Sequence, residues 1–169
     1  MSKGILIPFF FTKESILKGV KQELSLYAER IKDSDGNILF DELVFDEEYK
    51  SKLRELMLDA EAKIIDRFSA YMKYERLDTA SFHEEIGEDD YDKIEFTLLM
   101  PCAFNAQYGR LVSIKTREFI VAYISYRWLE VKMREDAVTF KFRADEALMD
   151  ARAYLEKRSR RCRTGGNLF

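Results

Sequence analysis

Hydrophobic residues recur at helical spacing along much of the chain, and the clearest run lies between residues 49 and 72. Its apolar positions follow the i, i+3, i+4, i+7 spacing that places side chains on one face of a helix. They are Tyr49, Leu53, Leu56, Met57, Ala60, Ile64, Phe68, Tyr71 and Met72. Asp46 precedes this run as an N-cap, and Glu47 and Glu48 lie where the helix dipole favours negative charge. The pattern predicts a helix from about Asp46 to Met72.

An earlier helix is predicted over residues 13–31. Thr12 stands at the N-cap position with Glu14 in the first turn. One apolar stripe follows, made of Ile16, Val20, Leu24, Tyr27 and Ile31. The turn formers from Asp33 to Asn37 end this helix, and the apolar stretch Ile38–Phe45 follows them. The apolar residues Ile5–Phe11 before the helix are expected to form an extended arm, whose pairing the sequence leaves open.

Two further helices are predicted in the C-terminal half. The first begins near Gln107–Val112, ends at about Glu135 and is apolar on more than one side, which is typical of the central helix of a bundle. The second is expected over about Phe140–Arg158. Its stripe consists of Ala144, Leu148, Ala151 and Leu155, with Ala147 and Tyr154 alongside.

The pattern between residues 74 and 104 differs from these helices. Glu75–Phe82 and Lys93–Phe104 are rich in β-forming residues, and Ile94–Leu98 alternates with period two. Acidic residues surround Gly87 between these stretches: Glu84, Glu85, Glu88, Asp89, Asp90 and Asp92. We therefore expect a β-hairpin with an acidic tip, and Pro101 should end its second strand or place that strand at an edge.

Composition supports a mainly α fold. The chain is 47% hydrophobic with 13 Phe and 9 Tyr, which excludes a disordered protein, and its 7 Gly and 2 Pro favour long helices. A length of 169 residues suits one domain that needs no disulfide or metal to fold. We predict a compact bundle of about four helices with an inserted β-hairpin arm and a basic C-terminal arm. This single domain covers residues 1–169, with arms at 1–11, 74–104 and 156–169.

Several classes of protein find no support. Cys102 and Cys162 are far apart and predict neither a disulfide framework nor a zinc site. Residues 5–11 are too short for a secretion signal, and no run approaches the roughly 18 apolar residues of a membrane span. We therefore expect an intracellular, soluble protein.

Candidate catalytic and metal sites are weak. Residues 33–37 resemble the start of a calcium-binding loop, but Gly36 is fourth rather than sixth and Val44 stands where that loop needs Glu. His83 is the only histidine, and neither a nucleophile elbow nor a phosphate-binding glycine loop is present. We predict no enzyme activity, no cofactor and no bound metal.

Charge is distributed unevenly. Residues 152–163 carry six basic side chains and one acid, a net +5, so the rest of the chain carries −8 of the total −3. The basic residues are Arg152, Lys157, Arg158, Arg160, Arg161 and Arg163. This tail could be a solvated helix end, an arm that docks on an acidic protein surface, or a nucleic-acid contact. The acidic residues 84–92 could form a solvated loop tip, a partner-facing surface or a cation site.

Four features together resemble the head–tail connector (adaptor or neck) proteins of tailed bacteriophages. They are the helix that contains Leu53–Phe68, the β-arm, the long helix Ile114–Glu135 and the basic C-terminal arm. Phe119–Glu130 is similar to the aromatic-rich helix of that family, and Tyr154–Arg161 resembles basic tails of structural proteins from phages of gut Bacteroidetes. In that family a short helix bundle carries an extended hairpin, and copies assemble as a ring beneath the portal.

The resemblance implies a structural virion protein that joins the portal to the tail by docking. Its partners would be further copies of itself, the portal and neighbouring neck or tail proteins, and contact with packaged DNA stays open. It would occur in the virion and, during assembly, in the host cytoplasm. The expected partner-binding residues are Arg152, Lys157, Arg158, Arg160, Arg161, Arg163, Phe169, Glu84, Glu85, Glu88, Asp89 and Asp90. The alternative is a small nucleic-acid-binding or regulatory helical protein that uses the basic tail.

Overall fold

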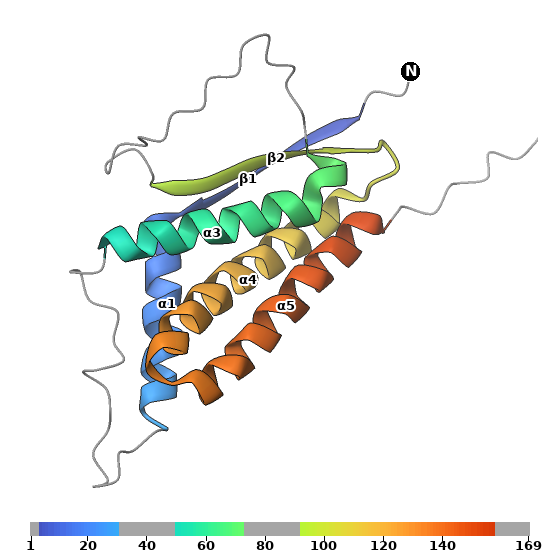
Figure 1. The fold of residues 1–169 in the computed structure, drawn as a ribbon. Helices are drawn as coiled ribbons and strands as arrows, with labels where there is room; N and C mark the ends of the chain where they lie inside the picture. The colour runs from blue at the N-terminus through green and yellow to red at the C-terminus, as the bar shows by residue number, and fades with distance from the viewer. Residues whose placement is uncertain (1–3, 31–49, 73–91, 158–169) are drawn as a thin grey trace, which may run out of the picture.

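A two-stranded sheet lies along one side of a group of helices (Figure 1). The computed structural model describes residues 4–30, 50–72 and 92–157. Within them the elements are β1 (Ile5–Thr12), α1 (Lys13–Ala28), α3 (Lys50–Phe68), η2 (Ser69–Tyr71), β2 (Lys93–Met100), α4 (Ala106–Lys132) and α5 (Arg134–Glu156). The prediction of a mainly helical fold with a small β element is confirmed. The acidic segment 84–90 and the tail from residue 158 lie outside the described residues.

Helix α1 begins where the sequence predicts. The Thr12 side chain accepts a hydrogen bond from the Ser15 backbone N–H at 3.3 Å, which satisfies one donor of the first turn. Three residues of the predicted stripe, Ile16, Val20 and Leu24, are buried, whereas Tyr27 is half-buried and Ile31 lies outside the described residues. The helix ends at Ala28, earlier than the expected residue 31.

Helix α3 buries the predicted stripe from Leu53 to Phe68. Its expected start at Asp46 lies outside the described residues. The expected end at Met72 is wrong, because the α-helix stops at Phe68 and tightens into the 3₁₀ turn η2. Met72 adopts an extended conformation and bridges to Leu98 of β2, so pairing with the sheet replaces the last helical turn.

Strand β2 pairs with the N-terminal strand β1 in an antiparallel register that places Phe9 opposite Phe96. The predicted hairpin partner, 75–82, lies outside the described residues. Strand β2 ends at Met100, directly before Pro101, which confirms that Pro101 ends this strand. Successive side chains of a strand point to opposite faces of the sheet, and Phe9, Phe11 and Phe96 point inward. The centre of the Phe96 ring lies 5.2 Å from that of Phe9, on which it stacks, and 5.9 Å from that of Phe68 in α3.

Helix α4 is the central helix, as the sequence predicts, since it contacts α1, α3, α5 and β1. Seven consecutive residues, Phe119–Ser125, are buried, which requires neighbours on several sides. The Asn105 side chain caps its start by accepting from the Gln107 N–H at 3.0 Å.

Helix α5 begins at Arg134, so the predicted start near Phe140 is wrong. The connection from α4 is the single residue Met133, whose backbone leaves the helical region without any Gly or Pro nearby. Glu135 and Asp136 occupy the first turn, where the helix dipole stabilises them. The stripe that faces α4 is rich in alanine, and its small side chains allow close antiparallel packing (Figure 1).

Candidate docking surfaces

Two of the predicted partner-binding residues, Arg152 and Lys157, lie in the described part of the chain, and both contact their own helix. Arg152 Nε donates to Glu156 Oε1 at 3.3 Å. Lys157 Nζ lies 4.7 Å from the centre of the Tyr154 ring and 5.4 Å from that of Tyr108. The contact of Lys157 with Tyr108 joins the end of α5 to the start of α4. The other predicted residues, Arg158, Arg160, Arg161, Arg163, Phe169, Glu84, Glu85, Glu88, Asp89 and Asp90, lie outside the described residues.

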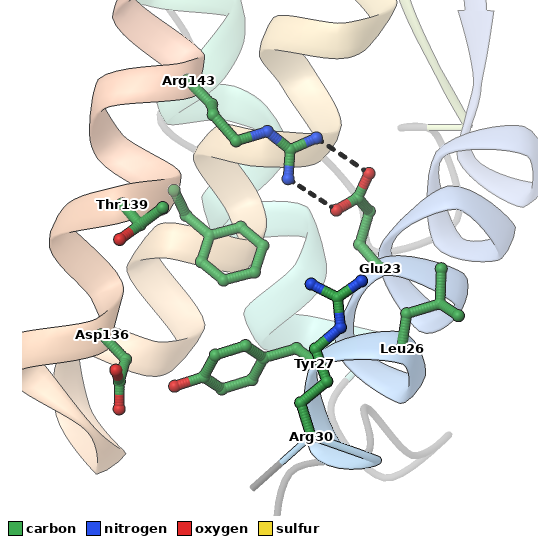
Figure 2. Close-up of a pocket in the computed structure, with 8 residues that line it drawn as sticks. Glu23, Leu26, Tyr27, Arg30, Asp136, Thr139 and Arg143 are labelled. Carbon is green, nitrogen blue, oxygen red and sulfur yellow. Dashed lines mark hydrogen bonds and ion pairs between the residues drawn. The ribbon is translucent and has the colours of Figure 1, made fainter.

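An ion pair joins α1 to α5 across a shallow seam (Figure 2). The two guanidinium nitrogens Nη1 and Nη2 of Arg143 donate to the Glu23 carboxylate at 2.9 and 3.1 Å. A pocket of about 320 Å³ lies on one side of this pair, lined also by Tyr27, Asp136 and Phe140. The Tyr27 ring meets Phe140 edge to face at 5.4 Å, so the floor of this pocket is part of the packing between α1 and α5.

Tyr27 and Arg143 both have a raised pKa in this seam, so the phenol stays neutral and the guanidinium stays charged at neutral pH. Burial raises the pKa of the Tyr27 hydroxyl above its ordinary 10.0, and the nearby Asp136 carboxylate acts in the same direction. The hydrogen bonds to Glu23 raise the pKa of the Arg143 guanidinium. A protonated tyrosine and a paired arginine are suited to holding two helices together rather than to accepting protons.

A second pocket, of about 390 Å³, lies on the other side of the Glu23–Arg143 pair. Its lining includes Gly19, Ile114, Arg117 and Val121. Arg117 donates to the Ser15 carbonyl at 3.2 Å and to its hydroxyl at 3.4 Å, so this cation joins α4 to the start of α1. Both pockets therefore belong to the contact between α1 and its two neighbours.

The outer face of α5 carries an apolar stripe that the sequence reasoning missed. Val138, Phe142 and Met149 are 61%, 70% and 59% exposed, although all three are apolar. Their spacings of four and seven residues place them on one face, opposite the buried alanine stripe. We name these three residues the α5 outer stripe. The spacing is visible in the sequence, but the predicted helix began near Phe140 and therefore excluded Val138.

The sheet carries a second exposed apolar surface. Leu6, Phe10 and Leu99 are 50%, 53% and 46% exposed and, with Pro8, point away from α3. Leu6 stands opposite Leu99 in the register, so these two side chains are neighbours. Lys93 Nζ lies 5.4 Å from the centre of the Phe10 ring at one end of this surface. We name Leu6, Pro8, Phe10 and Leu99 the outer sheet face.

These two surfaces lie on different sides of the molecule. Helix α3 packs against the inner side of the sheet, α4 lies beyond α3, and α5 is the outermost helix (Figure 1). The α5 outer stripe and the outer sheet face are thus separated by the helices between them. A single partner of small size would cover one of them and leave the other exposed.

No group of three or more His, Cys, Asp and Glu residues is placed to hold a metal ion within residues 4–30, 50–72 and 92–157. In the same part of the chain, no helix is both long and apolar enough to cross a membrane. No protein-family model, curated protein or solved structure matches this chain.

Proposed function

We propose that this chain is an assembly protein whose copies dock head to tail into a ring, and that the ring belongs to the neck of a tailed bacteriophage. The observation that supports docking is the presence of two separate exposed apolar surfaces, the α5 outer stripe and the outer sheet face. Monomeric proteins seldom expose contiguous apolar patches larger than a few hundred Å² unless the patch serves as an interaction site. Two unlike surfaces on one subunit suit heterologous contacts, which close into a ring when the rotation between neighbours allows it.

The packing of the helices fits a rigid subunit. Helix α4 contacts the other three described α-helices, and the Glu23–Arg143 pair joins α1 to α5. A ring subunit must hold its two docking surfaces at a constant angle, because an error in this angle accumulates around the ring.

We propose that neighbouring copies also contact each other through the acidic segment around Glu84–Asp90 and the basic arm 156–169. Opposite charges on neighbouring copies would steer correct association and suppress incorrect registers. The portal and adjacent neck or tail proteins are the proposed partners above and below the ring. The phage assignment itself rests on the resemblance of the sequence to head–tail connectors.

Mass spectrometry of purified virus-like particles from the source culture tests this function, with the soluble lysate as the comparison. We expect the chain in intact particles at a copy number close to that of the portal. A chain that is abundant in the lysate but absent from particles would contradict the proposal. It would favour a nucleic-acid-binding or regulatory role for the basic tail, in which binding weakens steeply as salt rises.

A further inference from the structure

We infer that Pro8 prevents further strands from pairing with the edge of β1, so that copies of this chain do not join by strand addition. Strand addition is the pairing of an extended segment with the unpaired backbone groups of an edge strand. The inference goes beyond the proposed function, because it concerns a contact that the fold prevents. It holds whichever function the chain has.

Strand β1 forms the open edge of the sheet in the described part of the chain. Strand β2 pairs with β1 on one side, and on its other side Met72 bridges to Leu98. Within residues 4–30, 50–72 and 92–157, no strand pairs with the other side of β1. An edge of this kind presents a row of backbone N–H and C=O groups to which another chain can add. We name this side of β1 the open edge.

One hydrogen bond fixes which backbone groups of β1 point to the open edge. The Lys13 N–H donates to the Asp92 carbonyl at 2.7 Å, and these two residues continue the register in which Thr12 stands opposite Lys93. In an antiparallel ladder, every second residue of a strand exchanges hydrogen bonds with the partner strand. The odd-numbered residues of β1 therefore bond to β2. The even-numbered residues turn their backbone nitrogens toward the open edge: Leu6, Pro8, Phe10 and Thr12.

Pro8 lies in the middle of this row and has no N–H to donate. A strand added at the open edge would lose one hydrogen bond there and would meet the Cδ atom of the proline ring instead. The ladder between β1 and β2 loses nothing, because the Pro8 nitrogen faces away from β2. Pro8 thus weakens pairing on one side of the strand alone.

The remainder of β1 has the properties of a strand that pairs readily. Its residues Ile5–Thr12 include no charged side chain, and its eight pairs with β2 run without a bulge. Charged side chains, bulges and proline are common means by which edge strands resist pairing. Apolar segments of about six or seven residues with high β propensity and no proline are typical sites of aggregation. Of those three means, β1 has only Pro8.

The substitution Pro8→Val tests this inference in the full chain. It restores the missing N–H in a residue that favours strands, and two copies that pair through β1 would each gain one hydrogen bond. We expect the association constant for self-association to rise by roughly tenfold. Sedimentation equilibrium over a range of protein concentrations gives this constant for wild type and variant. An unchanged constant would overturn the inference.

Two double variants separate pairing at the open edge from other causes of association. Phe10 is the next even-numbered residue, so Phe10→Pro removes an N–H from the same edge and spares the ladder with β2. Pro8→Val with Phe10→Pro should return to the wild-type association constant. Pro8→Val with Phe10→Ala removes the same ring but keeps the N–H, and it should stay above that constant. Equal association of the two double variants would show that the open edge is not the contact.

Amide hydrogen exchange tests the open edge in the wild-type chain, without any substitution. The Phe10 N–H should exchange at least roughly tenfold faster than those of Phe9 and Phe11, since only these two bond to β2. NMR spectroscopy follows the three amides separately. Equal protection of all three would show that another segment already pairs with this edge, which would overturn the inference. Circular dichroism of each variant checks that the fold is retained.

Discussion

A glycine at position 19 allows α1 to lie close to α4. A Cβ added at Gly19 would lie 2.8 Å from Cγ2 of Val121 and 3.3 Å from the Arg117 guanidinium. Valine in a helix has one strongly preferred rotamer, so its methyl group cannot easily move aside. The contact between the two helices thus depends on the absence of a side chain at this position.

We expect Gly19→Ala to lower the free energy of unfolding by about 1–3 kcal/mol, because overpacking outweighs the better helix propensity of alanine. Urea denaturation followed by circular dichroism measures the change. Gly109→Ala is the matched control, since nothing lies within 4 Å of a Cβ added there. That control should be neutral or slightly stabilising. An equal effect of both substitutions would contradict the close-approach explanation.

Tyr27 should make stability sensitive to high pH. Its folded pKa is raised above 10.0 by burial and by Asp136, so above pH 10 the unfolded chain loses a proton that the folded protein keeps. The stabilisation of the neutral phenol is therefore complete below pH 10 and declines as pH rises further. Tyr27→Phe should reduce the slope of stability against pH by up to about 1.4 kcal/mol per pH unit. Denaturation at pH 9 to 11, with wild type in parallel, measures that slope; unchanged slopes would contradict the assignment.

At the scale of single elements, the two faces of the small sheet have different roles. Phe96 stands inside an aromatic cluster with Phe9, Phe11 and Phe68, whereas Phe10 is exposed on the other face. The inner face thus stabilises the fold, and the outer face is available for contacts between copies.

Alanine substitutions separate these roles. Phe96→Ala should lower the free energy of unfolding by about 3–5 kcal/mol, the usual cost of removing a buried ring. Phe10→Ala should change it by less than about 1 kcal/mol, since exposed substitutions have small effects. Chemical denaturation of both variants at low protein concentration gives the comparison. A large loss in Phe10→Ala would mean that the outer face supports the fold of the single chain.

The helices and strands also show which local sequence signals were sufficient to predict the structure. Thr12 predicted the start of α1, because capping depends on neighbouring residues alone. The predicted start of α5 was wrong, because the single residue Met133 reverses the direction of the chain without a turn-forming sequence. The partner of β2 could not be inferred, since the pairing of strands more than 80 residues apart depends on where α3 and α4 place them.

At the scale of the whole molecule, the described core ends within α5. Leu155 is the last buried residue of the described chain, and Lys157 packs on Tyr154 and Tyr108. Under the proposed function, the basic residues that follow Lys157 are expected to serve assembly.

Removal of residues 158–169 should therefore leave a folded protein that fails to enter particles. Its midpoint of thermal unfolding should stay within a few degrees of the wild-type value, because every buried side chain of residues 4–30, 50–72 and 92–157 is retained. Circular dichroism measures the fold, and complementation of a phage lacking the gene measures assembly. Deletion of residues 164–166 alone keeps every basic residue and Phe169 and serves as the control. Unfolding of the longer truncation would contradict a tail devoted to docking.

The sequence by itself determined the helical character of the chain, the residues of the main buried stripes and the central place of α4. These properties follow from periodicity, since a helix or strand must turn one face inward whatever its neighbours are. Only the tertiary structure decided that β1 pairs with β2, that α4 approaches α1 closely at Gly19, and that Val138 and Phe142 stay exposed while Phe96 is buried. Each of these depends on which other element occupies the space beside a residue, and that is settled by packing between segments far apart in the chain.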